Sequence, residues 1–221
     1  LDSVRHLITK NTCAIFMETV QGEGGIYPAT DSFIKGVRQL CDENEILMVS
    51  DEIQCGMGRS GNMFAYQLYD IVPDIVVSAK ALGCGVPVGA IGTRGAATGV
   101  LRAGDHGTTY GSNPLAAAAV VAVFKLYQQY GILANVKAMT TYLDKALSEL
   151  AAQKAVIKEV RGLGLMKGIE LSIPAAPYIN ALQESGIIVI PSGSHVIRLL
   201  PPLILQKEHV DVLVNALKTI L

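Results

Sequence analysis

The chain has 221 residues, 50% of them hydrophobic, and its 18 basic and 19 acidic side chains leave a net charge of −1. This balance lacks the basic excess of a nucleic-acid-binding protein, and the longest apolar run, Leu115 to Phe124, is far shorter than the roughly 20 residues of a membrane span. We therefore expect an α/β protein of one large or two small domains, with no nucleic acid and no membrane as partner.

In chain order, the first elements predict two βαβ crossovers. A short apolar run at 14–17 precedes a Gly-rich turn and a helical pattern from Phe33 to Glu43, and the next strand pattern covers 46–51. A second crossover leads to a strand pattern that begins at Ile75 and ends at Lys80. Because these strands are apolar on both faces, they predict a parallel sheet covered by helices. The candidate N-caps of the first helix are Thr30, Asp31 and Ser32.

The later elements predict a change of architecture near residue 125. A Gly-rich return at 83–92 contains a further strand pattern, and a polar loop at 106–113 precedes a helix that starts at Pro114. A long amphipathic helix through Leu150, short strands near 156–160, 165–171, 186–190 and 196–200, and a last helix from Glu208 follow. We expect a large domain at 1–124 and a small α+β domain at 125–221.

Cysteine usage and the N-terminus add two expectations. The four cysteines show neither a C-x-x-C pair nor metal-ligand spacing, which is typical of reduced thiols in a cytoplasmic protein and predicts no metal site. The first residue is Leu1, and neither an initiator Met nor a signal sequence is present. We expect that the chain begins inside a longer protein.

Three side chains with reactive groups follow the predicted strands. Glu18, Asp51 and Lys80 come at the carboxyl ends of three strands, where ligands bind in parallel sheets. A lysine there can form a Schiff base with the aldehyde of pyridoxal phosphate, and a carboxylate can keep the pyridine nitrogen protonated. The alternatives are a surface lysine and a helix N-cap. The buried run before Lys80 and the compact 81–83 after it favour a desolvated, reactive amine.

A second motif, G-x-G-x-x-G at 56–61, is typical of dinucleotide-binding sites. In such a site the first glycine stands directly at the strand end, but here 51–54 intervenes and places two carboxylates where a pyrophosphate would approach. A nicotinamide-dependent oxidoreductase is therefore a remote alternative.

Five ordered segments decide between these readings: 21–25, 50–61, 73–83, 106–115 and 198–203. Together they resemble the class III aminotransferases, and the similarity covers nearly the whole chain. The resemblance implies the α/β fold of pyridoxal-phosphate-dependent transferases of fold type I, with a partial large domain around a mostly parallel sheet and a small C-terminal α+β domain. The family's phosphate loop, stacked aromatic residue and donor-recognition residues lie upstream and are not in this sequence.

The resemblance also implies a role for each candidate residue. Lys80 would bind the cofactor and act as the catalytic amine, Asp51 would pair with the pyridine nitrogen, and Gln54 would contact the phenolic oxygen. Thr109 would reach the cofactor phosphate of the neighbouring subunit, which implies a homodimer. Arg198 would bind the carboxylate of 2-oxoglutarate, and Glu23 would mask that arginine while the amino donor is bound, with Glu18 lining the same region.

Within the class, the segment 54–59 is most similar to acetylornithine aminotransferases. This implies transfer of the terminal amino group of N2-acetylornithine to 2-oxoglutarate in arginine biosynthesis. Ornithine, 4-aminobutyrate and succinyl-diaminopimelate stay open as donors, because the donor-selecting residues are outside the sequence. A further alternative is a catalytically incompetent fragment, since the chain alone should bind the cofactor poorly.

Overall fold

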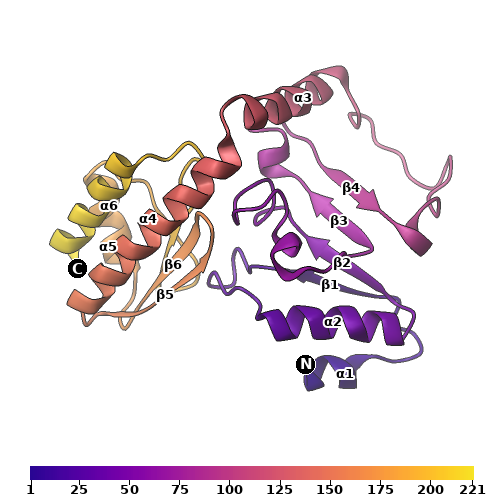
Figure 1. Ribbon diagram of the computed structural model, residues 1–221, viewed down its shortest axis with the longest axis horizontal. Coiled ribbons are helices and arrows are strands. Elements are labelled where there is room, and N and C mark those ends of the chain that lie inside the picture. The colour runs from indigo at the N-terminus through magenta and orange to yellow at the C-terminus, as the bar shows by residue number, and fades with distance from the viewer. The chain divides into compact units, whose positions relative to one another are not determined.

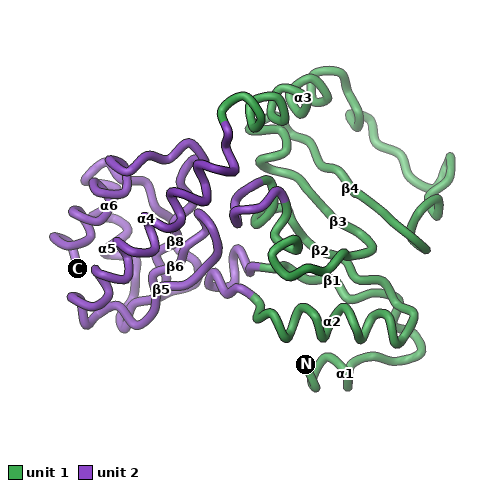
Figure 2. Tube along the Cα trace, viewed as in Figure 1, with its two compact units in different colours: residues 1–19, 29–57, 64–130 green, residues 20–28, 58–63, 131–221 purple.

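The computed structural model describes residues 1–221 (Figure 1), and the chain divides into two compact units that interleave in sequence (Figure 2). The first unit contains residues 1–19, 29–57 and 64–130, and the second contains 20–28, 58–63 and 131–221. The domain boundary expected near residue 124 stays a prediction, because compactness alone does not establish which part folds independently.

The first unit is built around a four-stranded sheet with the order β1-β2-β3-β4 (Figure 1). Its first three strands are parallel, as the sequence predicts, and β4 is antiparallel to β3. The strands are β1 (Ala14–Glu18), β2 (Leu47–Asp51), β3 (Ile75–Ser78) and β4 (Ala90–Thr93). The helices are α1 (Asp2–Leu7), α2 (Asp31–Glu43) and α3 (Pro114–Gln129), with short 3₁₀ helices at Ala65–Tyr69, Lys80–Leu82 and Gly95–Ala97.

The N-cap of α2 explains where the helix starts, and its apolar face explains how it packs. Thr30 is the N-cap, and its hydroxyl accepts a hydrogen bond from the backbone N–H of Phe33. One face of the helix buries Ile34, Val37 and Leu40, and the helix contacts β1 and β2. The crossover predicted between these strands is therefore confirmed.

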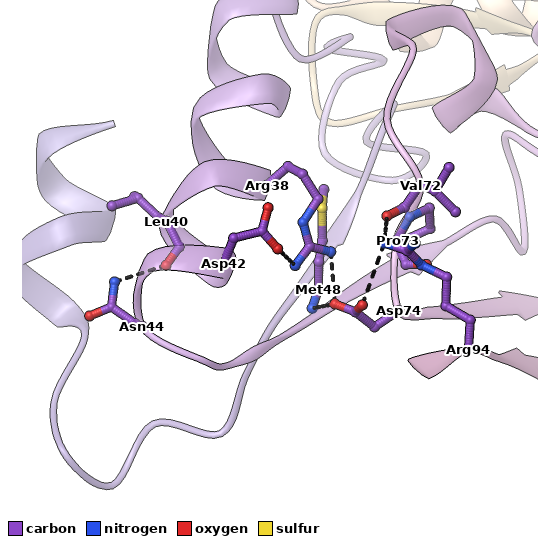
Figure 3. A network of polar contacts seen from close by, with 9 residues as sticks. All are labelled: Arg38, Leu40, Asp42, Asn44, Met48, Val72, Pro73, Asp74 and Arg94. Carbon is purple, nitrogen blue, oxygen red and sulfur yellow. Dashed lines mark hydrogen bonds and ion pairs between the residues drawn. The ribbon is translucent and has the colours of Figure 1, made fainter. Parts of the chain in front are cut away.

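An ion-pair network ties α2 to the amino ends of β2 and β3 (Figure 3). The Oδ2 atom of Asp74 accepts hydrogen bonds from Arg38 Nη1 at 2.7 Å and from the backbone N–H of Met48 at 2.8 Å. Arg38 also pairs with Asp42 one helical turn away, and Arg94 Nη2 lies 3.6 Å from Asp74 Oδ1. The network lies at the sheet edge opposite to the carboxyl ends of the parallel strands.

The second unit is built around an antiparallel sheet with the order β5-β6-β8-β7. Helix α4 packs on β5 and α6, and α5 packs on α6 and β7. The core of this unit includes the buried leucines at 143, 147 and 150 of α4 and the buried apolar residues Met166, Ile169 and Leu171 of β6. The elements are α4 (Ile132–Gln153), β5 (Ile157–Leu163), β6 (Met166–Leu171), α5 (Ala176–Glu184), β7 (Ile190–Pro191), β8 (Val196–Leu199) and α6 (Lys207–Ile220).

Two sequence expectations about this region are corrected. The long helix expected through Leu150 is broken, because Gly131 takes a left-handed conformation with φ +57° between α3 and α4. The strand expected at 186–190 is reduced to β7, because the N–H of Ile187 bonds to Leu182 O and so belongs to the turn that follows α5.

No single helix is long and apolar enough to span a membrane, and only α3 and α4 taken together as a broken pair meet that length and composition.

Candidate active site

The carboxyl edge of the parallel strands in the first unit carries three of the predicted residues. Glu18 ends β1 and is the register partner of Asp51, which ends β2. Asp51 is in turn the partner of Val77 in β3, and Lys80 follows two residues after the last residue of that strand. The structure thus places Glu18, Asp51 and Lys80 at one sheet edge, as the strand pattern predicts.

Lys80 lies in a tight and unusual turn. Its φ of +45° is in the left-handed region, which is uncommon for a residue with a side chain and is often found at functional sites. The N–H of Gly83 bonds to Lys80 O, and a Cβ at Gly83 would lie 2.2 Å from Val86 O, so only glycine fits there. These contacts fix the direction in which the lysine leaves the backbone.

The expected burial of Lys80 is not observed. Its side chain is exposed, and so are most residues of 84–113 after it. The correction has a simple reason: that segment contains many glycines and few large side chains, so it does not cover the amine. Desolvation of Lys80 therefore does not arise within this chain.

Asp51 is half-buried, and only one of its carboxylate oxygens is used inside the chain. Oδ1 accepts a hydrogen bond from the N–H of Ile53 at 3.0 Å, which closes the turn after β2. The helix N-cap alternative is not observed, because a turn and no α-helix follows. Oδ2 keeps its lone pairs for a donor from outside the chain. Gln54 lies in the same turn and is half-buried.

Glu52 is a residue whose importance the sequence did not reveal. It is fully buried, and four donors surround its carboxylate: the hydroxyl of Ser50, the thiol of Cys55 and the backbone N–H groups of Ala65 and Tyr66. Burial raises the pKa of Glu52, and the hydrogen bonds only partly oppose this. A charged residue directly after a buried strand was the available signal. Glu52 fixes the turn that contains Asp51 and Gln54.

The G-x-G-x-x-G segment at 56–61 does not have the structure of a dinucleotide site. It forms turns, and the next element is the 3₁₀ helix Ala65–Tyr69. No α-helix therefore begins at this glycine-rich turn to bind a pyrophosphate. Thr109, which the resemblance predicts to contact the cofactor phosphate of a neighbouring subunit, lies in an exposed loop at 102–113.

The second unit brings together Arg198 and Glu23. Arg198 lies in β8 and is buried, and its Nη1 atom donates to Glu23 Oε1 at 2.8 Å and to Gly22 O at 2.6 Å. Glu23 comes from the segment Val20–Pro28, which belongs to the same compact unit as β8 although 175 positions separate Glu23 from Arg198. The predicted arginine and its masking glutamate are therefore in direct contact.

Two further side chains hold the segment that carries Glu23. Ser192 is buried, accepts a hydrogen bond from Gly25 N at 2.8 Å and donates one to Glu23 O at 3.0 Å. Arg161 donates from Nε to Gly25 O at 2.8 Å and lies over the ring of Tyr27. These contacts give Arg161 and Ser192 a structural role in the loop, and the sequence gave no signal for Ser192.

A comparison with known protein families identifies the family to which this chain belongs. The family model described as "Aminotransferase class-III" matches residues 1–221, the whole chain. The chain belongs to the class III aminotransferase family. The resemblance of the five sequence segments and the fold expected from it are thereby confirmed.

Individual class III aminotransferases are similar over nearly all of this chain. The acetylornithine aminotransferase of Methanocaldococcus jannaschii is 44% identical over 98% of the chain and 54% of its own length. The succinylornithine transaminase of Yersinia pestis is 42% identical over 95% of the chain and 52% of its own length. A solved ornithine δ-aminotransferase of Plasmodium falciparum is 34% identical, with a TM-score of 0.92 over 98% of this chain and 56% of that one. The chain spans about half the length of the curated relatives that it matches.

Membership of the class III aminotransferases implies pyridoxal phosphate as the cofactor, and the residues present fit it in part. Lys80 offers an exposed amine, and Asp51 offers a carboxylate oxygen with unused lone pairs at the same sheet edge. These are the two groups that an aldehyde and a protonated pyridine nitrogen require.

Proposed function

We propose that this chain belongs to an aminotransferase that moves the terminal amino group of N2-acetylornithine to 2-oxoglutarate in arginine biosynthesis. The observation that carries the proposal is the placement of Lys80 and Asp51 at one edge of the parallel sheet in a class III aminotransferase chain. Pyridoxal phosphate supplies, when bound, an aldehyde carbon for the amino group and a ring that accepts electrons.

Lys80 and Asp51 have separate tasks in this proposal. The amine of Lys80 holds the cofactor between turnovers, and its Nζ atom then carries the proton that leaves the substrate carbon bearing the amino group. Asp51 would hold the cofactor at its pyridine nitrogen, where a carboxylate favours the protonated form. Gln54 orients the phenolic oxygen, and Glu52 keeps the turn of Asp51 and Gln54 in shape through its four buried hydrogen bonds.

Arg198 and Glu23 let one enzyme accept two differently charged substrates in turn. With the donor, Glu23 stays paired with Arg198 and neutralises it. With 2-oxoglutarate, Glu23 moves away and the substrate carboxylate takes its place on the guanidinium. Glu18 lines the region in which the donor binds. The order of events is ping-pong, because the donor leaves as its deaminated product, and the amino group stays on the enzyme until 2-oxoglutarate binds and takes it.

Other parts of the proposal concern the assembly and the location. Thr109 donates a hydrogen bond to the cofactor phosphate of a neighbouring subunit in a homodimer, and the exposure of its loop is compatible with that role. A cytoplasmic location is compatible with the four cysteines, none of which forms a disulfide.

The donor is the least constrained part of the proposal. The relatives carry the names of acetylornithine, succinylornithine and ornithine enzymes, and 4-aminobutyrate and succinyl-diaminopimelate are further candidates. N2-Acetylornithine is favoured because several relatives that are 44–47% identical over 92–98% of this chain bear that name. The second candidate is that this chain alone binds no cofactor and is therefore catalytically incompetent. The exposure of Lys80 supports this candidate.

The test uses the full-length natural protein, loaded with pyridoxal phosphate and supplied with 2-oxoglutarate and each donor in turn. We expect the highest kcat/KM with N2-acetylornithine, loss of all transfer in Lys80→Ala, and unchanged transfer in Lys10→Ala, a matched change of an exposed lysine. A higher kcat/KM with another donor overturns the substrate, and full activity in Lys80→Ala overturns the mechanism. Glutamate formation with the 221-residue chain alone would rule out the incompetent-fragment alternative.

A further inference from the structure

The segment Val20–Pro28 is a closed loop whose ends are joined by backbone contacts. Val20 and Pro28 form an isolated β-bridge, and the N–H of Gln21 bonds to Tyr27 O at 3.0 Å. The N–H of Ile26 bonds back to Gln21 O at 3.1 Å. Glu23 lies between these contacts, so the loop presents it from a short, internally bonded frame.

Ile26 fixes this loop to the sheet of the second unit. It is fully buried with a φ of +59°, a conformation that is an outlier for a β-branched residue and persists only where the surroundings enforce it. A Cβ built on Gly168 would lie 3.0 Å from Ile26 Cβ, and one on Gly162 would lie 3.1 Å from Ile26 Cγ2. The glycines of β5 and β6 thus leave space for the isoleucine, which keeps the loop seated.

Three polar side chains of the sheet region then hold the loop backbone on both sides of Glu23. Ser192 accepts from Gly25 N at 2.8 Å and donates to Glu23 O at 3.0 Å. Arg161 donates to Gly25 O at 2.8 Å, and Arg198 donates to Gly22 O at 2.6 Å. Breaking such buried hydrogen bonds costs about 1–3 kcal/mol for each group left without a partner, so the backbone here should not open readily.

The side chain of Glu23 is in the opposite situation. It is 72% exposed, whereas the side chain of Arg198 is 8% exposed. When an incoming carboxylate replaces Glu23 on the buried arginine, water solvates the carboxylate of Glu23, so neither charge is left without a partner. The side chain therefore moves at much lower cost than the backbone that carries it.

We infer that Ser192 is a positioning residue that fixes the backbone of Glu23, so that the Glu23 side chain alone moves on and off Arg198. This inference rests on the proposed function of that pair. Ser192 contacts the backbone of Glu23 itself, through the carbonyl oxygen. Without its hydroxyl, Gly25 N and Glu23 O lose their partner, the frame loosens, and Glu23 masks the arginine less well.

The test measures the equilibrium binding of glutarate, an inert five-carbon dicarboxylate, to the full-length natural protein loaded with cofactor. We expect Ser192→Ala to bind glutarate roughly three- to tenfold more tightly than the wild type, the range of one lost hydrogen bond. The matched control is Ser194→Ala, which removes an exposed hydroxyl in the same segment whose contact is His195, and it should bind glutarate like the wild type. Ser192→Cys keeps the size with a weaker hydrogen-bonding group and should lie between.

A double-mutant cycle separates positioning from a general loss of structure. In the Glu23→Gln background, Ser192→Ala should change glutarate affinity by less than about twofold. Residue 23 then carries no charge, so its position no longer affects how well Arg198 binds a carboxylate. Equal effects in both backgrounds, or wild-type affinity in Ser192→Ala, would overturn the inference. Hydrogen exchange of the peptide 20–28, expected to be faster in Ser192→Ala than in Ser194→Ala, checks that the loop is the part that loosens.

The same proteins distinguish this inference from the proposed function. If the wild type transfers no amino group but the glutarate cycle behaves as expected, the proposed function fails and the positioning by Ser192 stands. If the wild type transfers the amino group and the cycle shows no coupling between Ser192 and Glu23, the positioning fails and the proposed function stands.

Discussion

Arg198 Nη1 lies 2.8 Å from Glu23 Oε1, and the two partners differ in their exposure to solvent, with the arginine buried and the glutamate exposed. Glu23 occupies the Nη1 atom of the arginine, and its carboxylate can leave because water solvates it. A buried cation left without a partner is unfavourable, so an incoming carboxylate replaces Glu23 well. In the function proposed above, this asymmetry is what allows one site to accept two kinds of substrate.

Replacing Glu23 with Gln removes the charge that masks Arg198. We expect the KM for 2-oxoglutarate to fall by about two- to tenfold, because the substrate no longer competes with a carboxylate. The kcat/KM for the amino donor should fall, because the arginine stays charged and unmasked. Steady-state kinetics with each substrate varied measures both, with Glu184→Gln, an exposed change on α5, as the control. A parallel change in both half-reactions would argue against masking.

Replacing Arg198 with Lys keeps the charge but loses the planar fork that binds a carboxylate with two hydrogen bonds. We expect the KM for 2-oxoglutarate to rise about 10- to 100-fold, the loss of a charge-assisted contact of roughly 1.5–3 kcal/mol. The donor half-reaction should change much less. The two half-reactions are followed separately in single-turnover experiments, and a lysine variant with wild-type KM would remove Arg198 from substrate binding.

Asp74 should stabilise the first unit in an acid-sensitive way (Figure 3). Burial alone would raise the pKa of Asp74, but the N–H of Met48 and the guanidinium of Arg38 outweigh it and lower that pKa. A depressed pKa gives stability that is present above the unfolded value, about 3.9, and lost as the pH falls through the folded value. We expect Asp74→Asn to lower the free energy of unfolding by about 1–3 kcal/mol at neutral pH.

Asp42→Asn is the matched control for Asp74, because Asp42 pairs with the same Arg38 but is exposed. Its effect should be about 0.5 kcal/mol or less. Urea unfolding of each variant from pH 7 to pH 3 measures both, and the gap between wild type and Asp74→Asn should close at the acid end. A gap that is constant with pH, or equal for the two aspartates, contradicts this account of the network.

Glu52 should show the opposite pH dependence. Burial raises the pKa of Glu52, so its contribution to stability is fully present below the unfolded value, about 4.3, and is lost as the pH rises through the folded value. As the pH rises from the unfolded to the folded pKa of Glu52, the free energy of unfolding of the wild type should therefore decrease relative to that of Glu52→Gln. Above the folded pKa the difference should level off. Urea unfolding between pH 4 and pH 8 tests this, with the exposed Glu43→Gln as control. Parallel curves for wild type and Glu52→Gln would refute it.

Local sequence pattern was sufficient for the sheet that carries the proposed cofactor residues. Apolar runs that end at Glu18, Asp51 and Ser78 predict parallel strands, and the structure has them in register. Thr30 and Pro114 mark helix starts as their capping chemistry requires. These signals are carried by neighbouring residues, so they are visible without the fold.

Other features depend on contacts between distant residues or on the choice of one conformation among several. Ser192 contacts Gly25 across 167 positions, and nothing in the sequence near either residue indicates this. Ile26 takes the left-handed conformation that the glycines beside it would adopt more easily. Gly131 breaks the expected helix, although an isolated glycine in a helical pattern is often tolerated. The exposure of Lys80 depends on what covers it, which the strand pattern does not specify.

The central claim is that Lys80 is the residue that binds pyridoxal phosphate. The most direct measurement is borohydride reduction of the full-length natural protein with pyridoxal phosphate, followed by peptide mass mapping of every lysine. The account predicts one stable adduct on Lys80, and no adduct in Lys80→Ala. An adduct confined to another lysine, or a wild-type protein without any adduct, would contradict it.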